Sequence, residues 1–281
     1  MAVRSVDALL RESVDYAGMF PPAGLPIGDA MTMYKRHRAS AEGWLVGTFV
    51  VAADRLADLD PAVGPVSVVL NTPSAAAVEH VLRSNSEMRI AALELKPVAP
   101  EQVAEICAAV PDDIEAYFEI PVDHDLERRL DAVAAYGALA KIRTGGLTPD
   151  AFPHASAIYR FLRACRDRGL AAKATAGLHH AVSGCYPLTY EAAGASAPMY
   201  GFLNVCAAAA LVHLDATEKD GLRALSESSS GAFQFDDEGL EWRGHRFSTN
   251  DLRAMRQALF RSFGSCSLRE PIDELRLMRA I

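Results

Sequence analysis

The feature that most constrains the fold is a regular alternation of apolar, strand-like runs with amphipathic helical stretches in the middle of the chain. Such an alternation predicts successive βα units and a parallel sheet. The predicted strands are Trp44–Val51, Val66–Leu70, Ile90–Lys96, Ile114–Ile120, Leu139–Arg143 and Ala171–Thr175. The predicted helices that alternate with them are about Ala53–Asp58, Pro73–Ser84, Pro100–Ala109, Asp125–Tyr136 and Ala155–Arg168.

Six such units in about 130 residues fit a closed barrel better than an open sheet. No glycine-rich phosphate loop follows the first predicted strand, so a dinucleotide-binding fold has little support. We therefore predict an α/β protein with a (β/α)8, TIM-like barrel and a less regular last third. Because barrels of roughly 250 residues are routinely one domain, residues 1–281 are expected to form a single domain, with residues 1–40 as a helical and loop extension packed on the barrel.

The last third and the N-terminal segment are harder to assign. Residues Met199–Leu214 predict a helix with a short strand at its start, and Phe233–Phe235 with Leu240–Trp242 predict a hairpin. A helix over Asn250–Arg261 leads to a candidate closing strand at Phe263–Ser267 and to a final helix from Glu270. The turn-rich segment Asp15–Ala23 has two interpretations: a plug that seals the bottom of the barrel, or a loop that closes over the active site.

Composition argues against several classes of function. Half of the 281 residues are hydrophobic and the net charge is −8, which is typical of a globular protein without the basic surface that nucleic acid requires. Charged residues interrupt the N-terminus, and the longest apolar run, around Val205–Leu214, is too short to span a bilayer. A cytoplasmic protein with no membrane partner is expected. The five cysteines form no C-x-x-C pair, so neither a disulfide framework nor a structural zinc site is predicted.

Charged residues occur on the predicted strands themselves. Only five of the 28 basic residues are lysines, and three of these five fall on predicted strands. Because side chains alternate between the two faces of a strand, Ala140 and Ile142 can face the helices only if Lys141 and Arg143 face the lumen. The same alternation directs further polar side chains inward, namely Glu94, Lys96, Tyr117, Glu119, Lys173 and Thr175.

These inward residues lie near the carboxyl ends of their strands, where barrel enzymes carry their catalytic groups. An unpaired buried charge costs several kcal/mol, so the charged residues must pair with one another or contact a ligand. A self-satisfied ion-pair network is the structural alternative to an active site. We interpret the cluster as an active site for a small anionic or carbonyl substrate. The predicted catalytic residues are Lys141, Lys173, Glu119 and Glu94, and the predicted substrate-binding residues are Arg143, Lys96, Thr175, His179, His180 and Asn204.

Lysines in such a lumen can act as nucleophiles. A lysine near other cations and away from water has a lowered pKa, and its neutral amine can form a Schiff base with a carbonyl group. Lys141 and Lys173 on neighbouring strands are expected to lower each other's pKa in this way. Glu119 or Glu94 would then move protons, and Arg143 would hold a carboxylate or phosphate through a bidentate contact.

The two lysine strands resemble those of deoxyribose-phosphate-type class I aldolases. The segments are Ala140-Lys141-Ile142-Arg143-Thr144-Gly145-Gly146 and Ala172-Lys173-Ala174-Thr175-Ala176-Gly177-Leu178, about 40 residues from end to end. The resemblance implies a lyase in which Lys141 is the Schiff-base nucleophile and Lys173 lowers its pKa, with no cofactor. Counted from Trp44, these are the fifth and sixth strands, whereas the aldolases use the sixth and seventh.

Two further patterns bear on the resemblance. The phosphate-binding strand of the aldolases has only Phe263-Gly264-Ser265-Cys266-Ser267 as a counterpart, with backbone amides at a helix start. The chain as a whole, with its DYAGMFPPA, KATAGLHH and FGSCS segments, also resembles a bacterial α/β-barrel family, which implies the fold and no particular activity.

Other functions remain open from the sequence. His179 or His180 could join Glu119, Glu94 or Cys185 in a divalent-metal site of a barrel lyase or hydrolase, although nearby cations would repel the metal. Isomerase or other carbonyl chemistry is a further possibility, and a non-catalytic protein that binds a small anion needs the same cations.

Two local features also allow more than one interpretation. Cys266 fits either a nucleophile at a helix start or a small packing residue. The segment Trp242–His245 fits the barrel mouth or a subunit contact, which leaves a homo-oligomer open.

Overall fold

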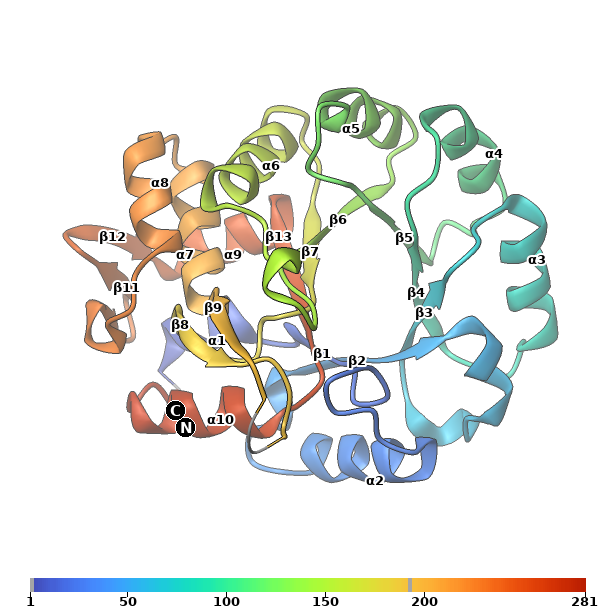
Figure 1. Cartoon of the computed structure of the whole chain (residues 1–281), viewed down its shortest axis with the longest axis horizontal. Helices are drawn as coiled ribbons and strands as arrows, with labels where there is room; N and C mark the ends of the chain where they lie inside the picture. The colour runs from blue at the N-terminus through green and yellow to red at the C-terminus, as the bar shows by residue number, and fades with distance from the viewer. Residues whose placement is uncertain (1–2, 192–193) are drawn as a thin grey trace.

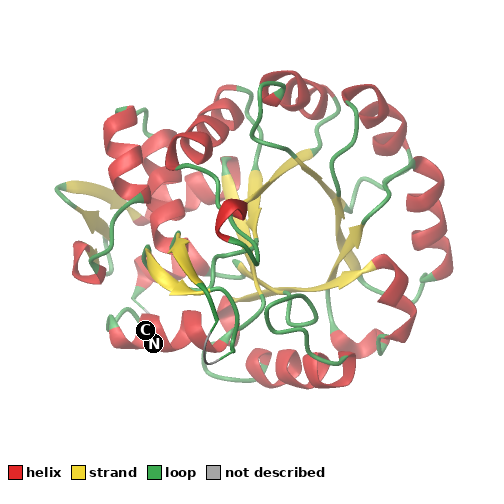
Figure 2. Cartoon of the chain, in the orientation of Figure 1, coloured by secondary structure: helices red, strands yellow, loops and turns green. Residues whose placement is uncertain are grey.

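Eight parallel strands close into a barrel in this computed structural model, which describes residues 3–191 and 194–281. Figures 1 and 2 show the barrel nearly end-on, with helices around its outside. Around the barrel the order is β1-β2-β3-β4-β5-β6-β7-β13, and each neighbouring pair is parallel. The barrel strands are β1 (Val14–Tyr16), β2 (Val46–Ala52), β3 (Val66–Leu70), β4 (Ile90–Leu95), β5 (Glu115–Glu119), β6 (Leu139–Arg143), β7 (Ala172–Thr175) and β13 (Phe260–Ser265). The predicted (β/α)8 barrel is confirmed.

Helices cover the outer faces of the strands. The α-helices are α1 (Arg4–Leu10), α2 (Ile27–Arg38), α3 (Ala75–Ser84), α4 (Val103–Ala108), α5 (Leu126–Ala135), α6 (Ala155–Asp167), α7 (Phe202–His213), α8 (Glu218–Leu225), α9 (Thr249–Ala258) and α10 (Arg269–Leu277). Short 3-10 helices are η1 (Gly43–Leu45), η2 (Ala53–Asp58), η3 (Pro61–Val63), η4 (Pro100–Gln102), η5 (Pro149–Ala151) and η6 (Ser230–Ala232). Each predicted helix is present, and Ala53–Asp58 is a 3-10 helix rather than an α-helix. None of the described helices has the length and hydropathy of a membrane span.

The first barrel strand was not predicted. Val14–Tyr16 lies in the segment expected to be part of an extension or loop, and it pairs with both β13 and β2. Three residues next to a turn-rich segment are too few to establish a period of two, so the one acid between Val14 and Tyr16 is a weak signal for this strand. With β1 included, Lys141 and Lys173 lie on the sixth and seventh strands of the barrel, and the sequence-based count of fifth and sixth is corrected.

The last third forms one long connection between β7 and β13. It contains an antiparallel pair, β8 (Gly184–Pro187) and β9 (Ser196–Met199), then α7, α8, a small three-stranded sheet and α9. That sheet consists of β10 (Phe233–Phe235), β11 (Gly239–Trp242) and β12 (His245–Ser248), which confirms the predicted hairpin and adds a strand to it. The predicted strand before α7 is β9, which pairs with β8 and is not part of the barrel. The closing strand, β13, begins three residues earlier than predicted.

The alternation of faces along the strands is as predicted. Ala140 and Ile142 on β6 are fully buried against the helices, whereas Lys141 between them is buried in the lumen at 2% exposure. Lys141 and Lys173 are among the largest fully buried side chains of the described chain, in a set otherwise made of aromatic and aliphatic residues. Ions at such depth require partners, and those partners define the site.

Candidate functional site

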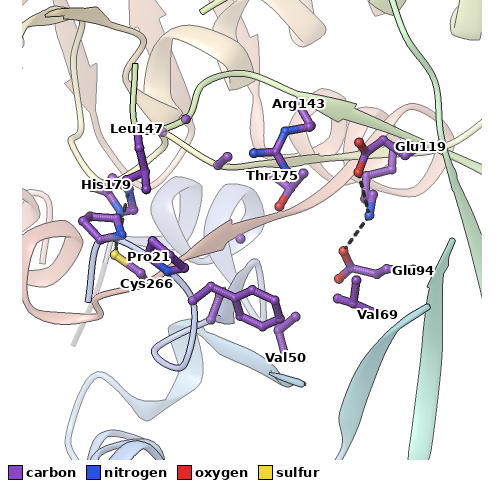
Figure 3. A pocket seen from close by; sticks show the side chains of 18 of the residues that line it. Pro21, Val50, Val69, Glu94, Glu119, Arg143, Leu147, Thr175, His179 and Cys266 are labelled. Carbon is purple, nitrogen blue, oxygen red and sulfur yellow. Dashed lines mark hydrogen bonds and ion pairs between the residues drawn. The ribbon is translucent and has the colours of Figure 1, made fainter. Parts of the chain in front are cut away.

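A pocket of about 310 Å³ opens at the carboxyl ends of the barrel strands. Figure 3 shows Glu94 and Glu119 at one end of this pocket, His179 and Cys266 at the other, and Arg143 and Thr175 between them. The lining also includes apolar side chains from several loops, namely Phe20, Pro21, Pro22, Val50, Val69, Leu147, Leu188 and Met199. The pocket therefore has a charged floor and a largely apolar wall, which suits a small molecule with a polar head.

Lys141 lies at the charged end of the pocket. Its Nζ lies 3.2 Å from Glu94 Oε2 and 3.2 Å from Glu119 Oε2. The side chains of all three residues are at most 8% exposed. Lys96, just after β4, approaches Glu119 at 3.4 Å and is partly exposed toward the pocket. Lys141 is thus both buried and in contact with the pocket, which is the arrangement that a nucleophilic lysine needs.

Lys173 lies deeper in the barrel than the pocket. Its Nζ is 2.6 Å from Asp15 Oδ2 and 2.7 Å from Glu94 Oε1, and the residue does not line the mouth pocket. Its ammonium also lies over the ring of Tyr117, 5.2 Å from the centroid. Glu94 therefore bridges the two lysines, and Ser67 donates a further hydrogen bond to it at 2.9 Å.

The pKa of Lys173 is shifted opposite to the sequence-based prediction. Burial lowers this pKa, but the carboxylates of Asp15 and Glu94 outweigh burial and raise it above the ordinary lysine value. The prediction that the two lysines lower each other's pKa considered only the cations, since Asp15 had been assigned to a loop. Lys173 is therefore charged at neutral pH, and its ammonium contacts Glu94.

The pKa of Glu94 is lowered well below its usual range. Burial alone would raise it, but the charges of Lys173 and Lys141 and the hydrogen bonds from Lys173 and Ser67 outweigh that effect. Glu94 is therefore a carboxylate at neutral pH. With Asp15 and Glu119, three carboxylates face four cations in and above the lumen, which are Lys96, Lys141, Arg143 and Lys173. The excess of one positive charge favours an anionic ligand.

Arg143 is the cation of this cluster that has no carboxylate partner among the described residues. It ends β6, lines the pocket, and makes a single hydrogen bond, to the carbonyl of Gly145 at 3.5 Å. Among the described residues no carboxylate forms an ion pair with it. Its guanidinium lines the pocket, and its predicted contact with a substrate carboxylate or phosphate stays a prediction.

The loops after β6 and β7 are joined directly behind Arg143. Thr144 Oγ1 donates to the carbonyl of Ala176 at 2.7 Å. Gly177 has a φ of +79°, and a Cβ there would lie 3.1 Å from the Cα of Gly145 and 3.0 Å from the Phe152 ring. The glycines of the two lysine segments thus allow the loops to pack together and keep the two strand ends in register.

His179 and Cys266 form the opposite end of the pocket. His179 Nδ1 is 3.2 Å from Ser265 Oγ and 3.6 Å from Cys266 Sγ. Burial, with a smaller contribution from His180, lowers the pKa of His179 to about 4, and burial raises the pKa of the Cys266 thiol to about 11. Both groups are neutral at pH 7, so the pair is not a thiolate–imidazolium nucleophile, and Cys266 fits the interpretation as a packing residue that also lines the pocket.

The buried, neutral state of His179 predicts a pH-dependent stability. Its pKa is about 4 in the folded state and 6.5 in the unfolded chain, so the unfolded state binds more protons between these values. The free energy of unfolding is expected to decrease as the pH falls through this window, by about 3 kcal/mol in total. Urea denaturation at a series of pH values between 7 and 4 measures this decrease.

The variant His179→Gln isolates the histidine contribution. Glutamine keeps a hydrogen-bonding side chain but cannot titrate, so the variant should lose less stability over the same pH range than the wild type. His124→Gln is the matched control, because His124 is exposed and should leave the pH dependence unchanged. A His179→Gln profile parallel to the wild-type profile would show that the imidazole is not held neutral by the fold.

Two predicted substrate-binding residues lie outside the pocket. His180 turns away from it, stacks on Tyr186 with ring centroids 3.5 Å apart, and bonds Glu274 at 2.6 Å. Asn204 is buried on α7, where its amide donates to the carbonyls of Ala224 and Glu227 and accepts from the Ser183 amide. Both predictions are corrected: these side chains fasten the loop after β7 to α8 and α10.

The side chains of the predicted metal ligands do not lie close together. Glu119 faces Lys141, His180 faces Glu274, and His179 lies at the far end of the pocket from Glu119 (Figure 3). In the described part of the chain, no three His, Cys, Asp or Glu side chains form a group suited to a metal ion. The geometry gives the metal-dependent alternative no ligand set.

Sequence reasoning missed Asp15 and the mouth loop that follows it. Asp15 accepts hydrogen bonds from Lys173, from Ser262 Oγ at 2.7 Å, and from both the amide and the hydroxyl of Thr48. Phe20, Pro21 and Pro22 line the pocket from above, so the loop lies at the mouth and the bottom-plug interpretation is wrong. The signal that could have identified β1 is the acid flanked by Val14 and Tyr16, which matches the polar-inward pattern of the other strands.

Comparisons with known proteins give limited information. No protein-family model matches the chain, and no curated protein matches it in sequence. One similar solved structure is a glycerophosphoryl diester phosphodiesterase from Parabacteroides distasonis, with 13% sequence identity and a TM-score of 0.34. The match covers 52% of this chain and 50% of that chain, so this chain spans about half the length of the structure that it matches. The assignment of the barrel therefore rests on the strand pairing described above.

Proposed function

We propose that the protein is a lyase of the Schiff-base type, in which Lys141 attacks the carbonyl group of a small anionic substrate. The observation that carries the proposal is the position of Lys141: its ammonium is buried between Glu94 and Glu119 and still lines the pocket. The position of the two lysines on the sixth and seventh strands adds support, because it agrees with the resemblance to class I aldolases.

Each side chain has a defined task in this proposal. Arg143 binds the carboxylate or phosphate of the substrate, and the apolar wall around Val50 and Val69 accommodates its carbon chain. Glu119 accepts a proton from Lys141, whose Nζ then forms a bond to the carbonyl carbon. Glu119 returns this proton to the carbonyl oxygen, which leaves as water, and a protonated imine remains.

The imine then serves as the electron acceptor for cleavage. Glu119 accepts the proton of the hydroxyl group on the β carbon as the bond between the α and β carbons breaks. The electron pair of that bond moves toward the imine nitrogen, one carbonyl product is released and an enamine remains on Lys141. Glu119 returns its proton to the enamine carbon, and water hydrolyses the new imine to free the second product and the amine. Lys173 takes no part in bond making: it keeps Glu94 charged and positioned beside Lys141.

Borohydride trapping tests the proposal. The protein is mixed with a panel of short 2-keto acids and aldehydes, reduced with sodium borohydride, and analysed by intact mass and peptide mapping. The expected result is a single adduct on Lys141, with a mass increase equal to the substrate less one oxygen atom. Lys35→Met is the matched control, because Lys35 is an exposed lysine paired with Asp60 and its loss should leave the adduct unchanged.

Two results would contradict the proposal. Adducts spread over Lys35 and Lys219 would indicate non-specific surface reaction. Tight binding of a small acid without an adduct and without a product would instead support the non-catalytic anion-binding function.

A further inference from the structure

A second cavity, of about 560 Å³, opens at the opposite end of the barrel. Its lining comes from the amino-terminal ends of the strands: Gly47 is the second residue of β2, Pro65 precedes β3, Arg89 precedes β4 and Glu115 begins β5. We call it the floor cavity, and its charged lining residues are Arg11, Glu12, Asp15, Arg38, Arg89, Glu115, Lys173, Arg256 and Arg261. The mouth pocket and the floor cavity share none of their lining residues.

The floor cavity is cationic in a protein that carries a net charge of −8. Six of its charged lining residues are cations and three are carboxylates; Asp7 and Glu94, just outside the lining, pair with two of the cations, which leaves an excess of one positive charge. Arg11 is paired with Asp7, and Arg261 is paired with Glu115. In the described part of the chain, Arg38, Arg89 and Arg256 have no carboxylate partner within ion-pair distance.

Arg256 is more buried than Arg38 and Arg89. It lies on α9, its guanidinium donates to the carbonyls of Leu9 and Arg11, and its buried Nε has no hydrogen-bond partner among the described residues. Burial lowers the pKa of this arginine, so its charge is held there at a cost. Arg38 likewise donates only to neutral oxygens, those of Tyr34, Val46 and Gly47.

We propose that the floor cavity binds a small polyanion, with Arg38, Arg89 and Arg256 as the main contacts. Guanidinium groups match the geometry of phosphate and carboxylate oxygens, and three arginines without a carboxylate partner among the described residues favour a ligand with two or more negative charges. The volume lies in the range of small-molecule sites. The inference is independent of the chemistry proposed for the mouth pocket.

The roof of the floor cavity connects it to the mouth. Lys173 and Asp15 line the cavity from above, and Lys173 also holds Glu94, which contacts Lys141. The same ion-pair network would thus separate a polyanion in the floor cavity from a substrate in the mouth pocket.

Isothermal titration calorimetry with pyrophosphate tests the proposal, with acetate as a singly charged comparison. The wild-type protein is expected to bind pyrophosphate and not acetate, with an affinity that decreases as salt is added. Arg89→Gln and Arg38→Gln should each weaken pyrophosphate binding by about tenfold, because each removes one charge-assisted contact. Arg83→Gln removes the same charge from α3, where Arg83 pairs with Glu79 outside the cavity, and should have little effect.

Arg143→Gln separates the two ends of the barrel. Binding that survives this change and is lost in the double variant Arg38→Gln/Arg89→Gln supports a floor site. Binding that is lost in Arg143→Gln and retained in the double variant would overturn the proposal, as would absence of pyrophosphate binding to the wild type.

Discussion

Replacing Glu94 with glutamine is expected to lower the free energy of unfolding by about 3 kcal/mol. Glu94 is 2% exposed and is the residue that contacts both buried lysines, so glutamine leaves an excess of positive charge in the lumen. The loss of stability is limited because Lys173 still pairs with Asp15 and Lys141 still pairs with Glu119. Urea denaturation of the wild type and the variant at pH 7 measures the difference.

Two further variants sharpen the Glu94 test. Glu79→Gln removes an exposed carboxylate that pairs with Arg83 on the surface of α3, and its effect should be below about 0.5 kcal/mol. The double variant Glu94→Gln/Lys141→Met removes the carboxylate together with one buried cation, keeps the Lys173–Asp15 and Lys96–Glu119 pairs, and should recover part of the lost stability. If Glu94→Gln has the wild-type midpoint, the lumen is hydrated enough to tolerate unpaired charge.

Replacing Lys141 with methionine is expected to abolish the borohydride adduct and to lower kcat/KM for the trapped substrate on the order of 10³-fold or more. The physical reason is that methionine fills a similar volume but has no amine to form the imine. The fold should persist, because after the change Glu94 still contacts Lys173 and Glu119 still contacts Lys96. Steady-state kinetics and intact mass after reduction are the measurements.

The variant Arg143→Gln should affect substrate binding, in contrast to Lys141→Met, which should affect the chemical step. Because Arg143 is proposed to bind the anionic group and not to react, its loss should mainly raise KM and leave the adduct on Lys141 detectable at high substrate concentration. A Lys141→Met protein that retains kcat/KM within a few-fold of the wild type would disprove the Schiff-base mechanism, whatever the effect of Arg143→Gln.

The inward charges were predictable because the period of a strand is local. Apolar Ala140 and Ile142 on either side of Lys141 decide which face of β6 meets the helices, and that decision needs no knowledge of the neighbouring strands. The same holds for Lys173, Glu94 and Glu119, all of which the structure buries in the lumen. Five neighbouring residues are enough to indicate such an orientation.

The pairing of these charges depended on contacts far apart in the sequence. Asp15 and Lys173 are 158 positions apart, and β1 is only three residues long, so no local pattern shows that they form an ion pair at 2.6 Å. Without that pair the lysines were expected to lower each other's pKa, whereas the pKa of Lys173 is raised. The sign of an electrostatic effect depends on every charge nearby, and only the closed barrel brings these charges together.

The sequence by itself determined the barrel, through six regular βα units, and most of the charged residues inside it, through the alternation of faces; Asp15 is the exception. The tertiary structure decided what those residues do. It placed Lys141 against the pocket and Lys173 beneath it, and it directed His180 and Asn204 toward neighbouring helices. The physical reason is one of range: side-chain direction follows from local backbone geometry, whereas burial, ion pairing and access to a cavity depend on how distant segments pack.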